Sequence, residues 1–230
     1  MKTLGLIGGT TYFSTADYYR YINDGINKKL GGDNYARLIL HSLNFGEIKK
    51  NNDAGDWEAN FKLLEEAGEN MKAGGAEGIV LCANTMHLLA DRLEGKINLP
   101  IIHIATATAN EIKKMNLKKV ALLGTKITME KDFFTNKLKN QNIEVLIPDD
   151  GDREFINRTI FEELGKEIFL QPTKTKYLSI IQKLISQGAE GIILGCTEIP
   201  LLIKPEDVTV PVFDTTRIHS DAAVNFSIGV

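Results

Sequence analysis

The strongest constraint on the fold of this chain is an internal repeat. The segment Gly188-Ala-Glu-Gly-Ile-Ile-Leu-Gly-Cys-Thr-Glu198 aligns without a gap with Gly75-Ala-Glu-Gly-Ile-Val-Leu-Cys-Ala-Asn-Thr85. The offset of 113 residues, 188 − 75, is about half of the 230 residues. Each copy has a glycine that ends a helix, an apolar run typical of a buried strand, and a polar turn where the strand stops. The repeat therefore predicts two related α/β lobes.

Helix and strand patterns alternate along the whole chain, which favours parallel sheets. We expect an α/β fold with two pseudo-twofold-related lobes, each a parallel four-stranded sheet flanked by helices. The N-terminal lobe takes residues 1–103 plus 215–230, and the C-terminal lobe takes 104–214. Residues 99–103 provide the fourth strand of the first lobe. Because open α/β sheets bind ligands at the carboxyl ends of their strands, we expect the active site in the cleft between the lobes.

Small polar residues mark the expected helix starts. Ser14 and Thr15 are expected to cap a helix over 16–30, and Asp56 to cap a later one. Thr128 is expected either to cap the helix that follows it or to face the cleft.

Composition excludes several classes of function. The net charge of −3 and pI near 5.9 argue against a nucleic-acid surface, which needs clustered Lys and Arg. The apolar run at the N-terminus is too short for a signal peptide or a membrane span, so we expect a cytoplasmic protein without membrane contact. The four histidines show no metal-ligand spacing, and the phosphate-cradling glycine motifs are absent. No metal and no cofactor are expected.

The predicted cleft is lined by four turns at strand ends, which are poor in fixed charge and rich in Thr, Asn and backbone N–H groups. Such a lining suits a small carboxylate held by amides. Of the two cysteines, Cys196 aligns with Ala83 in the repeat, and Cys82 aligns with Gly195. A thiol in this position is suited to act as a nucleophile or to carry protons to and from carbon, and nearby helix N-termini are expected to lower its pKa.

Five groups of residues form motifs along the chain: Gly5-Leu-Ile-Gly-Gly9 with Ser14-Thr15, Ser42-Leu-Asn-Phe45, Asn84-Thr-Met-His87, Leu122-Leu-Gly-Thr125 with Thr128-Met129, and Gly195-Cys-Thr-Glu-Ile-Pro-Leu-Leu202. In these motifs the sequence resembles the aspartate/glutamate racemases, closest to the broad-specificity or glutamate/aspartate branch. The resemblance covers essentially the whole chain. It implies a PLP-independent isomerase that acts on a small amino-acid substrate as a homodimer. It also implies one acid/base residue on each face of the substrate Cα.

The resemblance assigns a role to each residue that matches its motifs. Cys196 is the implied acid/base on one face, and Glu198 orients the thiol or the substrate ammonium. The implied ligands of the α-carboxylate and ammonium are Thr10, Asn84, Thr85, Thr128 and Thr197. For a distal carboxylate, the candidate cations facing the cleft are Lys166 and also Lys49 or Lys50.

The departure from the family pattern is Ala83, which occupies the position of the second acid/base. Cys82 is one residue short, and on a strand that places it on the opposite face. Three explanations stay open. Ala83 is an engineered silencing change, or it is natural and the second proton comes from water or from Cys82, or the protein uses one thiol only. Weak racemisation at best is expected; the alternatives are a one-thiol decarboxylase or isomerase and a non-catalytic carboxylate binder.

Overall fold

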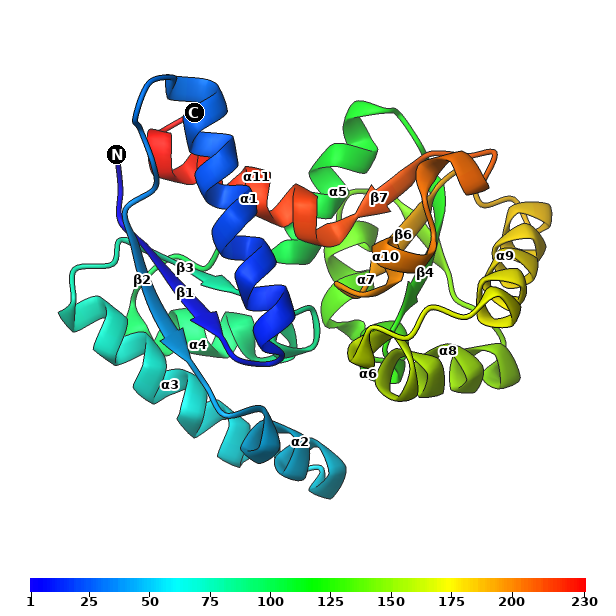
Figure 1. Cartoon of the computed structure of the whole chain (residues 1–230), viewed down its shortest axis with the longest axis horizontal. Helices are drawn as coiled ribbons and strands as arrows, with labels where there is room; N and C mark the ends of the chain where they lie inside the picture. The colour runs from blue at the N-terminus through cyan, green and yellow to red at the C-terminus, as the bar shows by residue number, and fades with distance from the viewer. The chain divides into compact units, whose positions relative to one another are not determined.

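The computed structural model describes all 230 residues, which divide into two compact units. Unit 1 contains Met1–His103 together with His219–Val230, and unit 2 contains Ile104–Ile218. The chain passes from one unit to the other at 103/104 and again at 218/219, inside the last helix (Figure 1). No helix is both long enough and apolar enough to cross a membrane.

Unit 1 is built on a parallel sheet of three strands in the order β2-β1-β3. The strands are β1 (Leu4–Gly8), β2 (Leu38–Ser42) and β3 (Gly78–Leu81). The helices are α1 (Tyr12–Leu30), α2 (Phe45–Ala54), α3 (Trp57–Ala73), the 3₁₀ helix η1 (Thr85–Leu89), α4 (Ala90–Ile97) and the end of α11 (Thr215–Ile228). β1 and β3 are buried along their whole length, as expected for central parallel strands covered on both faces.

The fourth strand expected at 99–103 is wrong. This segment makes a single bridge, Ile79↔Ile101, to the edge of the sheet. Ile79 donates its N–H to the Pro100 carbonyl and accepts from the Ile102 N–H. Pro100 has no N–H with which to extend the ladder, and helix α5 begins at Ile104, so the pairing stops after one residue.

The two faces of the sheet in unit 1 carry separate cores. Ile79 and Leu81 pack with α3 and α4, whereas Val80 and Cys82 pack with α1 and α11. Alternate residues of a strand point to opposite faces, so one strand supplies both cores. Asp56 caps α3 by accepting from the Ala59 N–H, which confirms that predicted helix start.

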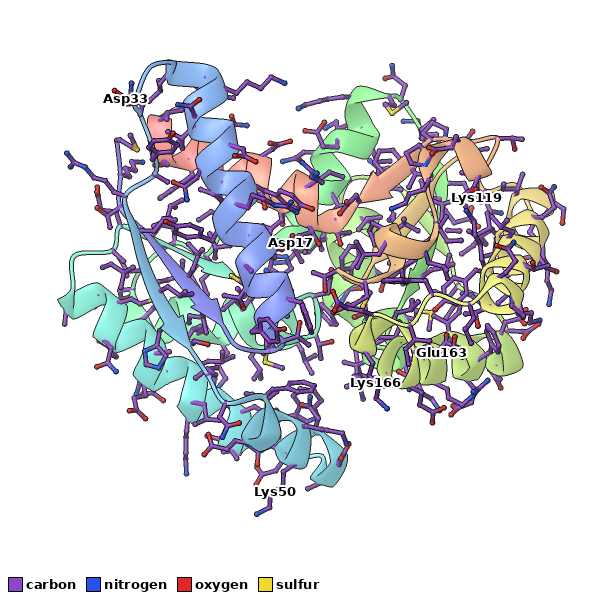
Figure 2. The ribbon with its side chains drawn as sticks, viewed as in Figure 1. Asp17, Asp33, Lys50, Lys119, Glu163 and Lys166 are labelled. Atoms are coloured by element: carbon purple, nitrogen blue, oxygen red, sulfur yellow. The ribbon has the colours of Figure 1, made fainter.

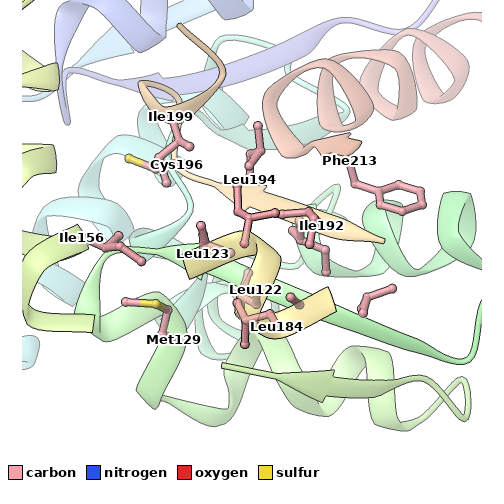
Figure 3. Packing of buried hydrophobic residues seen from close by; sticks show 14 of the residues in the cluster. Leu122, Leu123, Met129, Ile156, Leu184, Ile192, Leu194, Cys196, Ile199 and Phe213 are labelled. Atoms are coloured by element: carbon pink, nitrogen blue, oxygen red, sulfur yellow. The ribbon is translucent and has the colours of Figure 1, made fainter. Parts of the chain in front are cut away.

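Unit 2 has the expected parallel four-stranded sheet, in the order β5-β4-β6-β7. The strands are β4 (Lys119–Gly124), β5 (Glu144–Leu146), β6 (Ile192–Gly195) and β7 (Val212–Asp214). The helices are α5 (Ile104–Lys114), α6 (Lys126–Glu130), α7 (Asp132–Lys139), α8 (Asp150–Glu162), η2 (Leu164–Lys166), α9 (Gln171–Ser186), α10 (Ile199–Leu202), η3 (Pro205–Asp207) and the start of α11. The central strands interlock with these helices in one continuous apolar core (Figure 3).

The repeat seen in the sequence recurs in the topology. In both units the strand of the repeat, β3 or β6, pairs with the first strand of its own sheet. The glycines that open the two copies have the same backbone conformation, with φ of 90° at Gly75 and 98° at Gly188. That left-handed conformation lets the chain leave a helix and turn into a strand, and only glycine adopts it without strain.

Two predicted helix caps are wrong. Helix α1 begins at Tyr12, and Thr11 is its N-cap, so Ser14 and Thr15 lie inside the first turn. Helix α6 is capped by Thr125, whose hydroxyl accepts from the Thr128 N–H. In both places the helix begins nearer to the strand than the sequence pattern suggests. The cap of α1 is Thr11, two residues after Gly9, and the cap of α6 is Thr125, directly after Gly124.

Candidate active site

The turn after β6, residues 196–198, is the β6 turn, and it is held in place from both sides. The Thr215 hydroxyl donates to the Leu194 carbonyl at 2.9 Å, which fixes the end of the strand. Pro200 lies in the first turn of α10, where its ring favours the helical backbone and its missing N–H leaves no intrahelical bond unmade. Cys196 therefore stands at a defined position, with its side chain at the edge of the core (Figure 3).

The thiol of Cys196 has a carboxylate as its immediate partner. Its Sγ donates to Glu198 Oε2 at 2.8 Å, and the Thr197 hydroxyl donates to the same oxygen at 2.7 Å. Cys196 and Glu198 are both only 8% exposed. A carboxylate within hydrogen-bond reach of a thiol is placed to take its proton.

The expectation that local dipoles lower the pKa of Cys196 is wrong for this arrangement. Burial raises the pKa of the Cys196 thiol well above its ordinary value, and the negative charge of Glu198 raises it further. The backbone N–H groups of the turn act in the opposite direction, with a smaller effect. The resting Cys196 is therefore a protonated thiol that donates to the Glu198 carboxylate.

The turn after β3, residues 82–85, is the β3 turn, and its first two side chains lie on opposite faces of the sheet. Cys82 is 1% exposed in the core with α1 and α11, and burial raises the pKa of its thiol. Its Sγ lies 3.9 Å from the Val80 carbonyl. Ala83 packs against the other core, beside α3 and α4. The Cys82 thiol is thus turned away from the face that carries Ala83.

The rest of the β3 turn continues into a 3₁₀ helix rather than an α-helix. Asn84 is buried and directly precedes η1, which Thr85 begins. The His87 N–H donates to the Asn84 carbonyl at 3.0 Å. The His87 ring also contacts the turn, with Nδ1 2.9 Å from the Ala83 carbonyl.

The turn after β1 lies at the same edge of the sheet as the β3 turn. Gly9 has a φ of 85°, and a Cβ there would come within 2.0 Å of the Leu43 carbonyl oxygen, so only glycine fits. The Ser14 hydroxyl, in the first turn of α1, donates to the Cys82 carbonyl at 3.0 Å and so ties the start of α1 to the β3 turn. The Thr10 hydroxyl is buried beside them and makes no hydrogen bond.

Thr128 supports the β6 turn from beneath. It is fully buried, and its hydroxyl lies 3.0 Å from that of Thr125. A Cβ added to Gly195, the residue before Cys196, would contact Thr128 Cγ2 at 3.3 Å. Thr128 therefore packs against the strand end that carries the thiol.

The candidate lysines are all exposed. Lys166 is the last residue of η2, and Glu163 is the residue that joins α8 to η2 (Figure 2). Helix η2 packs against α10, the helix that follows the β6 turn. Lys49 and Lys50 lie on α2 in unit 1, and Lys49 pairs with Asp53 at 2.5 Å. Only Lys166 belongs to the same unit as Cys196.

The site residues form two groups, one in each unit. At the carboxyl edge of the sheet in unit 1 lie Thr10, Ala83, Asn84 and Thr85, and at that of unit 2 lie Thr128, Cys196, Thr197 and Glu198. No three His, Cys, Asp or Glu side chains are arranged to hold a metal ion. From the sequence, His87 is expected to be structural without a named contact, and Glu198 is expected to orient the thiol or the substrate ammonium. The structure adds that the Glu198 carboxylate accepts a hydrogen bond from the Cys196 thiol itself.

Comparisons with known proteins agree on one family. The profile described as Asp/Glu/Hydantoin racemase matches residues 7–223. A crystal structure of a candidate Asp/Glu racemase from Yersinia pestis is 48% identical and has a TM-score of 0.94, with coverage of 99% of this chain and 100% of the other. An aspartate racemase homologue from Pyrococcus horikoshii OT3 is 41% identical, with a TM-score of 0.86 and the same coverage. A broad-specificity amino-acid racemase from Bacillus subtilis (strain 168) is 22% identical over 96% of both chains.

Proposed function

Because this chain belongs to the Asp/Glu/hydantoin racemase family, we propose that it is a cofactor-independent amino-acid racemase of the aspartate/glutamate type. The reaction removes the proton from Cα and returns one. The observation that carries the proposal is the 2.8 Å hydrogen bond from the Cys196 thiol to Glu198 at a strand end. The substrate is a small amino acid, bound at the strand-end turn that carries Cys196.

Cys196 is the acid/base on one face of Cα, and Glu198 stores its proton. Transfer from Sγ to Glu198 leaves a thiolate beside a neutral carboxyl group. The thiolate then takes the Cα proton as the C–H bond breaks, and its electron pair moves into the substrate carboxylate. A substrate ammonium placed near the turn favours the thiolate, because an opposite charge favours the ionised form of a thiol.

The opposite face carries Ala83, which has no proton to give. A thiol that works alone returns the proton to the face it came from, so it exchanges the Cα hydrogen without inverting the centre. The core position of Cys82 supports water over Cys82 as a second donor. Loss of a positioned acid/base reduces rates by about 10²- to 10⁴-fold, so we expect impaired racemisation.

Substrate binding falls to the hydroxyls and amides of the strand-end turns. Thr10, Asn84, Thr85 and Thr197 hold the α-carboxylate and ammonium. The buried Thr10 hydroxyl supports this role, since an unpaired buried hydroxyl calls for a partner. Thr128 acts beneath the β6 turn, and Lys166 is the candidate for a distal carboxylate, because η2 packs against α10.

The test is Cα hydrogen exchange in D₂O, followed by NMR on L- and D-aspartate and L- and D-glutamate separately. Exchange of one enantiomer only, abolished by Cys196→Ala, is expected. Ala83→Thr and Ala83→Cys should then allow both enantiomers to exchange and raise racemisation. No exchange by the native protein or by either Ala83 variant would contradict the proposal.

The single thiol opposite Ala83 also favours a second candidate, a one-thiol decarboxylase or isomerase. Release of CO₂ from a substituted malonate, lost in Cys196→Ala, would identify it. A non-catalytic carboxylate binder predicts stabilisation by the amino acid without any exchange.

We also propose a cytoplasmic homodimer. Sedimentation of the purified protein would test the oligomeric state, and cell fractionation would test the location.

A further inference from the structure

Three imidazoles and a phenol lie together inside unit 1. The His87 ring is 4.9 Å from that of His103 and 5.1 Å from that of His219, centroid to centroid. Tyr18 meets His219 edge-on at 5.4 Å. His103 is the last residue before the first crossing to unit 2, and His219 is the first after the return. This ring cluster thus joins the β3 turn to both places where the chain passes between the units.

Hydrogen-bond partners determine which ring nitrogens of His87 and His219 carry a proton in this ring cluster. A carbonyl only accepts, so the Ala83 carbonyl requires a proton on His87 Nδ1. The Ile102 carbonyl in the same way requires a proton on His219 Nε2. His219 Nδ1 then accepts from the Tyr18 hydroxyl at 2.8 Å. The neutral ring of His87 carries its lone pair on Nε2, which is buried and makes no hydrogen bond.

We propose that His87 is a positioning residue, whose Nδ1–H holds the Ala83 carbonyl and so fixes the backbone that presents Asn84 and Thr85 to the substrate. The proposal rests on the proposed function of this turn. His87 also binds the Asn84 carbonyl through its own N–H, so two successive carbonyls of the β3 turn are held by one residue.

Space filling alone does not account for an imidazole at this position. The side chain is 1% exposed, and a ring nitrogen without a hydrogen bond there is unfavourable by about 1–3 kcal/mol. A phenylalanine would fill similar space without that penalty. What the imidazole adds is the donor at Nδ1, aimed at the residue that stands before Asn84.

Asparagine and glutamine separate the two ring nitrogens. In His87→Asn the side-chain amide lies where Nδ1 was and still donates to Ala83, whereas in His87→Gln it lies where Nε2 was. We expect KM to stay within about threefold of the native value in His87→Asn and to rise about tenfold in His87→Gln, as for one lost buried hydrogen bond. The kcat of both should change by less than about threefold. Cα exchange rates of the preferred enantiomer supply both constants.

His219 provides the matched control, because its bond to the Ile102 carbonyl uses Nε2. At position 219, therefore, glutamine places its amide where Nε2 was and keeps the donor to Ile102, whereas asparagine does not. His219→Asn should lower the melting temperature more than His219→Gln. The better-tolerated variant is thus Gln at position 219 and Asn at position 87. Equal KM values for His87→Asn and His87→Gln, with both proteins folded, would overturn the proposal.

A readout without turnover keeps this inference separate from the proposed function. The ring ¹⁵N shifts of His87 should show a protonated Nδ1, and amide exchange of residues 84–86 should speed up in His87→Gln but not in His87→Asn. If the native protein exchanges no amino acid while these signals appear, the function fails and the role of His87 in fixing the turn stands. A protonated Nε2 with a bare Nδ1 would refute that role.

Discussion

Acid should destabilise unit 1 through His87. Burial lowers the pKa of this group from 6.5 to about 4, against smaller opposing effects of nearby backbone groups, of which the Ala83 carbonyl is the largest. Because the unfolded chain binds the proton more readily than the folded one, stability is full above pH 6.5 and is lost as the pH falls towards 4. At about 1.4 kcal/mol for each tenfold difference in proton affinity, the loss reaches about 3 kcal/mol below both values. Near pH 5 it is about 2 kcal/mol.

The assay is urea unfolding followed by the fluorescence of Trp57, the single tryptophan, which lies in unit 1 beside the core with α3. The free energy of unfolding is measured at intervals from about pH 7.5 to about pH 4.5. His87→Asn is the comparison, since it keeps a donor to Ala83 but cannot titrate. His219 remains in both proteins; burial lowers its pKa, and the charge of His87 lowers that pKa further, so the difference between the two curves reports His87 together with this coupling. If the two curves run parallel, the reasoning about His87 is refuted.

Three more outcomes are expected. Glu198→Gln should slow Cα exchange by about 10²- to 10⁴-fold while amino-acid binding, measured by calorimetry, persists, because only the proton store is removed; unchanged exchange would exclude Glu198 as the base. Gly9→Ala should destabilise unit 1 by more than about 2 kcal/mol in unfolding followed by Trp57 fluorescence, because the new Cβ meets the Leu43 carbonyl at 2.0 Å. The control is Gly55→Ala, where φ is 68° and the space around the new Cβ is open. It should destabilise the protein by only about 1 kcal/mol. Cys82 should resist alkylation in the native protein and react in urea, as peptide masses would show, because it is 1% exposed and burial raises the pKa of its thiol.

The sequence predicts those parts of the fold that depend on local pattern. The repeat locates β3 and β6, and the same alignment predicts that each pairs within its own lobe. Asp56 caps α3 because the first N–H groups of a helix lack partners within the helix, and a side-chain oxygen just before the helix can accept from one of them. This requirement is local in sequence. These features need no knowledge of the partner elements.

The failures depend on contacts that are distant in sequence or on competition between neighbours. Residues 99–103 look like a strand, yet Pro100 and the start of α5 leave room for only one bridge. Thr11 takes the cap position from Ser14, whose hydroxyl instead reaches the Cys82 carbonyl, 68 residues away. Neither outcome follows from propensity.

The candidate site divides in the same way. The motif order predicts Cys196 and Glu198 as neighbours, but the sign of the pKa shift of Cys196 depends on burial and on the carboxylate rotamer, which only the structure gives. His87 has no ligand spacing and looks like an ordinary core residue. Its importance appears when residues 103 and 219, far apart in the chain, are found against its ring.

The composition of unit 1 from both ends of the chain has a consequence for biosynthesis. Val224 completes the core that begins with Leu4, and the Lys2 N–H donates to the Ser227 carbonyl at 2.7 Å. During translation, residues 104–218 emerge as a complete unit while the first 103 still lack their last helix. The apolar face of α1 and β1 therefore stays uncovered until residues 219–230 have left the ribosome. In this interval the nascent chain is most exposed to aggregation and most dependent on chaperones.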